Sequence, residues 1–156
     1  MRKALFFLAV FGLVGSLWAA DTMGTWKLNL AKSTLPPNMA ANVKESILVF
    51  REIDADTIEG SSTQTLKDGK TTTAKWTTPK SGGIQTYQQG APEKGISTLA
   101  VIIDEDTIYN VTLQNGKQVQ LTPINFSKDG KTFTITYKGT DAQGKPYEYF
   151  VLYEKQ

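Results

Sequence analysis

The feature that most constrains the fold is an alternation of apolar and polar residues, interrupted at short intervals by turn signals. In the clearest segment, 131–139 (KTFTITYKG), Phe133, Ile135 and Tyr137 share one phase and threonines occupy the other. A period of two sends successive side chains to opposite faces, as in a half-buried β-strand. Asp-Gly and Asn-Gly pairs between such segments suit tight hairpins, because glycine accepts positive φ angles. The pattern predicts an all-β domain built from consecutive antiparallel hairpins.

The expected strands follow one another with only short connections. They lie at 24–30, 43–53, 57–66, 70–78, 84–89, 96–103, 107–114, 117–125, 131–139 and 146–155. The segment 31–42 contains two prolines and is expected to be a loop with at most one helical turn. Strands joined in this way can close into an up-and-down barrel, which removes exposed sheet edges. We expect the last strand to pair with the first.

Two of these strands, 97–103 and 147–155, are apolar in both phases. A strand that is apolar on both faces needs cover on its outer side, a protein partner or a second layer.

The first twenty residues have the layout of a secretory signal peptide. Arg2 and Lys3 precede an apolar run that ends in small residues. We therefore expect a leader at 1–20 and the barrel domain at 21–156, with the protein exported to the periplasm or secreted. The alternative is an uncleaved anchor, since 4–20 is at the short limit of a membrane span.

Missing residue types exclude several kinds of chemistry. The chain has no histidine and no cysteine, which rules out a Ser-His-Asp relay, a thiol nucleophile, a disulfide and an ordinary structural zinc site. Removing residues 1–20 lowers the Lys and Arg count from 17 to 15, equal to the 15 acids. A balanced charge with scattered lysines does not favour nucleic-acid binding.

An acidic cluster, Glu52, Asp54, Asp56 and Glu59, suggests a calcium loop or a catalytic carboxylate pair. Its spacing misses that of an EF-hand loop, and Asp is common in hairpin turns. We therefore expect no metal site, no catalytic residue and no cofactor.

The first strand opens with Gly24-Thr25-Trp26, a Gly-x-Trp triplet that resembles the lipocalin and wider calycin pattern. The resemblance implies an antiparallel up-and-down barrel of about 8–10 strands. It also implies that Trp26 lies across the closed end, that Gly24 lets the chain pass close by, and that a basic residue near the last strand, here Lys155, packs on the tryptophan. GTWKLNLAKS at the front and SKDGKTFTITYKGTDAQGKP near the end are similar to a group of small secreted bacterial proteins described as lipocalin-like.

Mid-strand aromatic residues are the candidates for a ligand-binding wall. Trp76 lies in a strand of threonines and lysines, and Tyr87, Tyr109 and Tyr137 combine an apolar ring with a hydroxyl. Arg51 is in phase with Ile47 and Val49, so an inward orientation would let it bind an acidic head group. For each of these residues the alternative is an ordinary structural role: core packing for the aromatics, and a solvent-exposed strand end for Arg51.

The leading hypothesis is an exported lipocalin-like protein that binds a small apolar or amphipathic molecule inside the barrel without turnover. The alternative is a filled barrel that acts as an envelope or protein-interaction module. A ligand lumen of about 300 Å³ or more separates the two.

Overall fold

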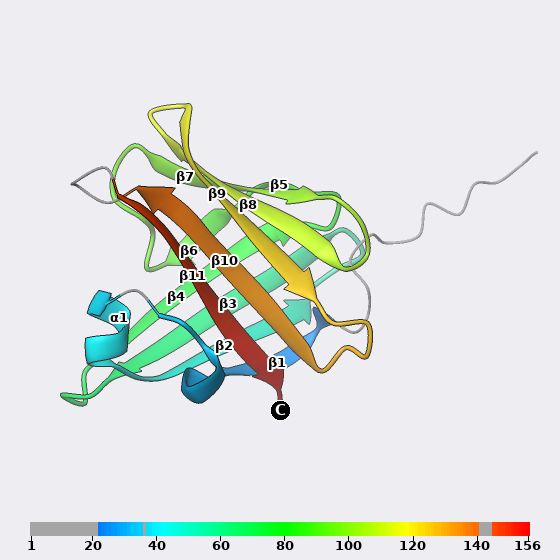
Figure 1. The fold of residues 1–156 in the computed structure, drawn as a ribbon. Coiled ribbons are helices and arrows are strands. Elements are labelled where there is room, and N and C mark those ends of the chain that lie inside the picture. The colour runs from blue at the N-terminus through cyan, green and yellow to red at the C-terminus, as the bar shows by residue number, and fades with distance from the viewer. Residues whose placement is uncertain (1–21, 36, 141–144) are drawn as a thin grey trace, which may run out of the picture.

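The computed structural model describes residues 22–35, 37–140 and 145–156, and the leader expected at 1–20 lies outside these ranges. The chain forms a single antiparallel sheet with two short helical segments after the first strand (Figure 1). The strands are β1 (Gly24–Leu28), β2 (Val43–Glu52), β3 (Thr57–Leu66), β4 (Thr71–Pro79), β5 (Gly83–Ile84), β6 (Thr86–Gln89), β7 (Ile96–Ile102), β8 (Thr107–Gln114), β9 (Lys117–Phe126), β10 (Thr132–Thr140) and β11 (Pro146–Lys155). Apart from one break at Gln85, the expected strands agree with these bounds within about two residues.

The sheet curls until its two ends meet. Its strand order is β5-β7-β8-β9-β10-β11-β1-β2-β3-β4-β6, and β11 pairs with β1, with Lys155 opposite Trp26. β5 pairs with β7, whereas β6, which follows directly in the chain, pairs with β4. Between them the backbone N–H of Gln85 donates to the carbonyl of Thr98 at 2.9 Å. The segment 83–89 therefore joins both edges, and the predicted up-and-down barrel is confirmed.

The connection between β1 and β2 differs from the loop that was expected. It contains a 3-10 turn, η2 (Leu30–Lys32), and a short helix, α1 (Pro37–Asn42). The Asn29 side chain caps η2 by accepting the backbone N–H of Lys32 at 3.0 Å.

This connection also pairs with part of β11. The backbone N–H groups of Asn29 and Thr34 donate to the carbonyls of Leu152 and Phe150 at 2.9 and 2.8 Å. The chain thus continues beside β11 in the plane of the sheet after β1 ends, and the outward Phe150 stays 37% exposed.

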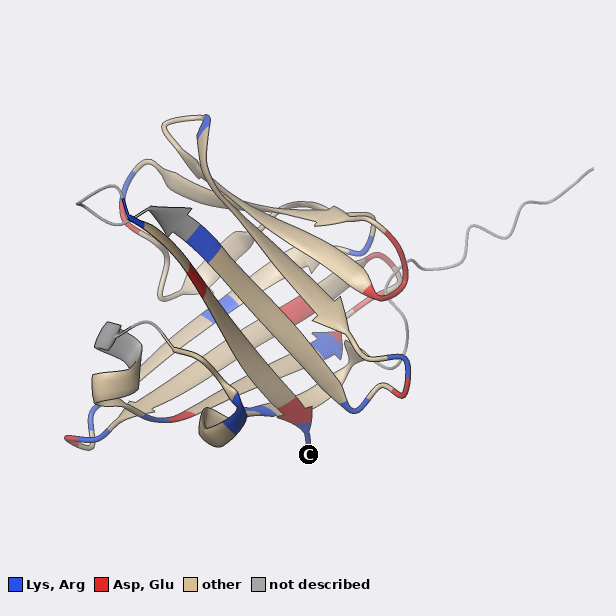
Figure 2. Cartoon of the chain, viewed as in Figure 1, with Lys and Arg blue, Asp and Glu red and all other residues tan. Residues whose placement is uncertain are grey.

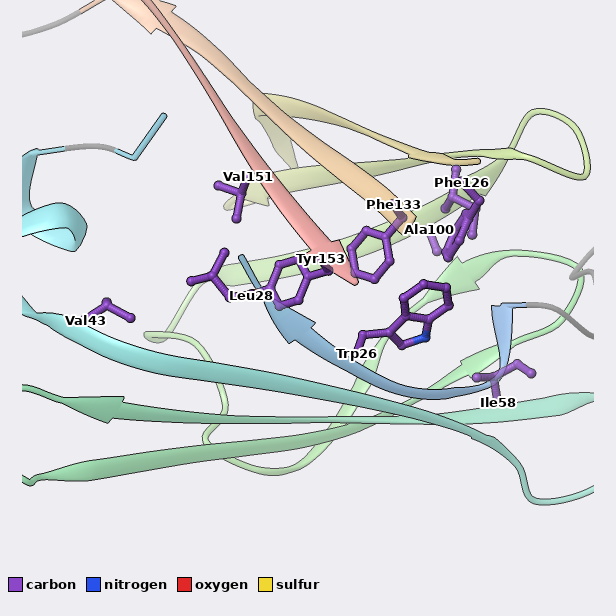
Figure 3. Packing of buried hydrophobic residues seen from close by; sticks show 10 residues of the cluster. Trp26, Leu28, Val43, Ile58, Ala100, Phe126, Phe133, Val151 and Tyr153 are labelled. Carbon is purple, nitrogen blue, oxygen red and sulfur yellow. The ribbon is translucent and has the colours of Figure 1, made fainter. Parts of the chain in front are cut away.

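Trp26 forms the floor of the barrel. It is fully buried, and its ring packs edge-on against Phe133 and Phe126, with ring centroids 5.0 and 5.8 Å away (Figure 3). The indole N–H donates to the carbonyl of Thr22 at 3.1 Å, which satisfies the one polar atom of the side chain. Large aromatic side chains packed in this way supply much of the hydrophobic stabilisation of a small domain.

The resemblance to calycins also predicted the contacts around Trp26. Gly24 has a φ of +124°, and a Cβ placed on it would lie 3.2 Å from the side chain of Lys155. The ammonium of Lys155 lies 5.3 Å from the centre of the Trp26 ring, within the range of a cation–π interaction. The roles expected for Gly24 and Lys155 thus fit the observed packing.

None of the helices within the described ranges is both long and apolar enough to cross a membrane.

Candidate ligand-binding cavity

A cavity of about 430 Å³ lies inside the barrel, above the floor made by Trp26. This volume exceeds the roughly 300 Å³ that separates a ligand lumen from a filled barrel. The strands that surround the cavity contribute two kinds of wall, one aromatic and one polar. Its lining residues are Leu48, Phe50, Ile58, Ser62, Ala74, Trp76, Thr78, Gln85, Tyr87, Gly90, Pro92, Thr98, Ala100, Ile108, Asn110, Thr112, Gln120, Thr122, Ile124, Phe126, Phe133, Ile135, Tyr137 and Tyr153.

The aromatic wall comprises seven of the lining residues, from strands β2, β4, β6, β9, β10 and β11. They are Phe50, Trp76, Tyr87, Phe126, Phe133, Tyr137 and Tyr153.

A glycine makes room for the centre of the aromatic wall. Phe50, Gly60, Trp76 and Tyr87 are direct neighbours across β2, β3, β4 and β6. A Cβ on Gly60 would lie 2.5 Å from the Trp76 ring, so the indole rests directly on the glycine backbone. The Phe50 and Trp76 rings meet there edge to face, with centroids 6.5 Å apart.

Tyr153 is held rigidly at the base of the aromatic wall. Its ring stacks on Phe133 with centroids 4.9 Å apart and an interplanar angle of 11°. Its hydroxyl lies 3.0 Å from the hydroxyl of Ser46, and both side chains are buried. Burial raises the pKa of the Tyr153 phenol, while the hydrogen bond with Ser46 partly opposes this shift.

Tyr137 lines the cavity and differs from Tyr153 in its partners. Its hydroxyl makes no side-chain hydrogen bond within the part of the chain that the structure describes. Burial, reinforced by the nearby Tyr153, raises the pKa of the Tyr137 phenol to about 12. The neutral hydroxyl is therefore available to a molecule inside the cavity.

The polar wall faces the aromatic wall and comes from β7, β8 and β9. It consists of Thr98, Asn110, Thr112, Gln120 and Thr122. In the described ranges, the side chains of Asn110 and Gln120 make no hydrogen bond with other protein groups. Both side chains are half-buried, and polar groups inside a cavity are normally satisfied by protein, water or ligand, so this wall offers donors and acceptors to the lumen.

The cavity lining is uncharged, since it contains no Asp, Glu, Lys or Arg. Taking an ionised group into such an environment without a counter-charge costs several kcal/mol. The arrangement is therefore suited to a neutral molecule that has both an apolar surface and hydrogen-bonding groups.

Three of the five predicted ligand residues line the cavity. Trp76, Tyr87 and Tyr137 lie in its aromatic wall. Tyr109 lies on the opposite phase of β8 from Ile108 and Asn110, and it is not part of the lining.

The expected inward orientation of Arg51 is wrong. Ser46, Leu48 and Phe50 form the inward phase of β2, so Arg51 faces out with Ile47 and Val49 and is exposed. The alternation along β2 was identified correctly, but the sequence left open which phase faced the core. Arg51 cannot bind a head group inside the barrel from this position.

Sequence reasoning missed several residues that shape the cavity. Phe50 and Gly60 were overlooked because their importance comes from pairing across three strands, which no local pattern contains. Asn110 and Gln120 were overlooked because only aromatic residues and Arg51 were considered as wall residues. The signal that marks them is the absence of charge in strands whose other phase is apolar.

The acidic cluster has a structural role at a turn. The carboxylate of Asp54 accepts the backbone N–H of Asp56 at 2.8 Å, and this hydrogen bond is the main cause that lowers the Asp54 pKa. Asp104 accepts the N–H of Asp106 in the same way, at 3.0 Å. Within the described residues, no three acids gather closely enough to hold a metal ion.

Comparison with solved structures supports the fold. A point mutant of the fluorescent protein UnaG aligns with a TM-score of 0.58 at 14% identity, covering 87% of this chain and 96% of that one. Wild-type UnaG aligns with a TM-score of 0.56 at 13% identity, covering 86% and 96%. At this identity the likeness concerns the fold alone, and the fold is a calycin-type barrel. No protein-family model and no curated protein matches the chain.

Proposed function

We propose that the protein binds one small, uncharged, amphipathic molecule in the barrel and does not transform it. The observation that carries this proposal is the cavity of about 430 Å³, with an aromatic wall opposite a polar wall and no charged lining residue. Small-molecule sites in proteins have volumes of about 300–1,000 Å³ and combine apolar surface with a few polar groups. A filled barrel has no such space, so this alternative receives no support from the packing.

Binding would be driven by removing apolar ligand surface from water against the aromatic wall. Hydrogen bonds to Asn110, Gln120 and the Tyr137 hydroxyl would orient the polar edge of the ligand. These groups gain partners only when the cavity is occupied by ligand or water, so a matched ligand also relieves their unsatisfied state.

The site is tested with Nile red, a neutral amphipathic dye whose emission rises in apolar surroundings. We expect saturable binding with a stoichiometry of one, accompanied by quenching of tryptophan emission. The Trp76→Phe variant should lose most of the quenching while still binding the dye, since Trp76 lines the cavity and Trp26 lies beneath it. The absence of saturable binding by any member of a broad panel of neutral dyes would refute the proposed site.

The ligand class is tested separately by competition. 1-Dodecanol and dodecanoate have the same chain length, but only the acid carries a charge at neutral pH. The alcohol should displace Nile red at a concentration at least about tenfold lower, because no cation lines the cavity. Equal displacement by both compounds would leave the binding site intact but refute its selectivity for neutral ligands.

We also propose, from the leader expected at 1–20, that this binding takes place outside the cytoplasm. Mass spectrometry of the protein isolated from its own host tests this, because export with cleavage removes the first residues and retention leaves them.

A further inference from the structure

One part of the barrel exterior is apolar. On β5, β7, β8 and β9, the residues that alternate with the polar wall point outward. We call them the outer apolar face, and they are Ile84, Leu99, Val101, Tyr109, Val111, Val119, Leu121 and Pro123.

These residues form continuous rows across the strands. Ile84 pairs with Leu99, Leu99 with Val111, and Val111 with Leu121. The next row contains Val101, Tyr109 and Pro123 in the same way. Direct neighbours on one face of a sheet form a contiguous surface.

The outer apolar face is separate from the core and open to solvent. Val111 is only 8% exposed, yet it is not part of the core cluster, because its neighbours on the same face cover it. The rim residues Ile84, Val119 and Leu121 are 61%, 56% and 40% exposed. Contiguous exposed apolar surface of this kind typically marks an interaction site.

Charged residues are absent from the strands that carry this face, except for Lys117 at the start of β9. Figure 2 shows the charges of this region gathered in the turns. Elsewhere on the barrel, the outward residues form ion pairs, as between Lys75 and Glu59 at 2.7 Å and between Lys138 and Glu148 at 3.1 Å. The face therefore has the apolar centre and charged periphery of a protein interface.

The charges beside β8 have opposite signs at its two ends, and the turn that follows β9 adds Lys128, Asp129 and Lys131 next to the acidic end. The turn between β7 and β8 carries Asp104, Glu105 and Asp106. At the other end of β8, Lys117 follows the turn between β8 and β9. The loop before β7, whose Gly95 carbonyl accepts the backbone N–H of Asn115 in that turn, carries Lys94 and one acid, Glu93. A two-fold axis that lies in the plane of the face and perpendicular to β8 would reverse the strand. It would place the acidic end of one copy over the basic end of the other, twice.

We propose that the outer apolar face binds the same face of a second copy of this chain. β7, β8 and β9, about 4.8 Å apart and with about seven residues each at a rise of about 3.3 Å, give a footprint of roughly 330 Å² per copy, to which the two residues of β5 add little. This area belongs to the small end of protein interfaces, so the dimer is reversible and depends on concentration. The proposal does not depend on a ligand, because the outer apolar face and the cavity lie on opposite sides of the same strands.

Sedimentation equilibrium of the full chain over a wide concentration range tests the dimer. The wild type should shift from monomer to dimer, and Leu121→Glu should raise the midpoint concentration at least about tenfold by placing a charge in the contact. Val119→Glu is a second variant if Leu121→Glu does not fold. Ile53→Glu, at a 51% exposed site in the turn between β2 and β3, is the matched control and should leave the midpoint unchanged.

Charge exchange tests the arrangement of the two copies. Glu105→Lys and Lys117→Glu should each weaken the dimer, and the double variant should restore it, because the opposite charges again face each other.

Three results would overturn the proposal. One is a wild type that stays monomeric at all concentrations. Another is self-association that Leu121→Glu and Ile53→Glu change equally, which would show that the contact lies elsewhere on the chain. The third is binding to phosphatidylcholine vesicles that Leu121→Glu abolishes while the wild type does not self-associate, which would make the face a lipid contact.

Discussion

The two sides of the barrel wall distribute polarity differently. On β1, β2, β10 and β11, aliphatic and aromatic side chains face inward, and the outward charges form pairs such as Lys27 with Glu45 at 2.6 Å. On β7, β8 and β9, the inward phase mixes apolar core residues such as Ile108 with uncharged polar side chains such as Asn110 and Gln120, and the outward phase is largely apolar. The first arrangement is that of an ordinary sheet with one buried face, whereas the second has a mixed inner face and an apolar outer face.

This difference separates stability from recognition. The inward residues of the first side pack around Trp26 and Phe133 into the main core cluster. The polar wall adds little apolar burial, and its half-buried amides have no hydrogen bond with protein groups of the described ranges, which leaves them to water or a ligand. We therefore expect substitutions on the first side to act mainly on the free energy of unfolding, and substitutions on the polar wall to act mainly on ligand binding.

The largest effect should come from Trp26→Ala. The side chain is fully buried among Phe126 and Phe133, and truncating such a residue typically lowers the free energy of unfolding by about 3–5 kcal/mol. Chemical denaturation measures the change, with Thr112→Val in the polar wall as a control that should differ from wild type by less than about 1 kcal/mol. Equal losses for both variants would contradict the division between the two sides.

Gly60→Ala should have the next largest effect. The new Cβ would lie 2.5 Å from Trp76 and force the indole off the sheet, which typically destabilises by about 1–3 kcal/mol. The same substitution in a Trp76→Phe background should be less harmful, because the smaller ring lacks the atoms in conflict. A double-mutant cycle in urea measures this coupling, and strictly additive losses would show that the glycine is needed for another reason.

Most of the fold was predictable because hairpins leave local traces. Turn residues punctuate the chain, and alternation specifies the strands between them, so β3 and β8 were predicted with their observed bounds. Trp26, Gly24 and Lys155 were placed through the family resemblance. The break between β5 and β6 was not foreseen, because only the pairing of each half with a different neighbour shows it.

The cavity was predictable only in part. Alternation shows which residues share a face but not which face is inside, and this ambiguity caused the error at Arg51. It also concealed the polar wall, since polar residues alternating with apolar ones normally face solvent. Only closure of the sheet places Asn110 opposite the aromatic wall.

A high-pH measurement probes the aromatic wall directly. The Tyr137 phenol has a pKa of about 12 in the folded protein, and that of Tyr153 is also raised, whereas an unfolded tyrosine titrates near 10. Above pH 10 the folded state therefore holds protons that the unfolded chain has lost. The resulting contribution to stability is complete below pH 10 and disappears as the pH rises to about 12, by an amount on the order of 2 kcal/mol for Tyr137.

Denaturant titrations between pH 8 and about 12 test this prediction, and Tyr137→Phe should show a shallower loss of stability than the wild type. A variant that follows the wild-type curve throughout would show that the Tyr137 phenol does not contribute to the pH dependence.

The smallest effect on stability, and the sharpest test of the comparison, is expected from Asn110→Leu. The two side chains are close in size, and the change removes an amide that lines the cavity without a protein partner in the described ranges. The free energy of unfolding should rise by less than about 1 kcal/mol, because a half-buried amide without a protein partner in the described ranges is replaced by an apolar side chain. Displacement of Nile red by 1-dodecanol should weaken in the same variant, since the alcohol loses a hydrogen-bonding partner.

Asn125→Leu, at an exposed position on β9, is the control for a general effect of replacing Asn by Leu. Opposite signs for stability and binding would show that the polar wall is maintained for a ligand at the expense of the fold, whereas a loss of both would place Asn110 among the residues that hold the barrel together.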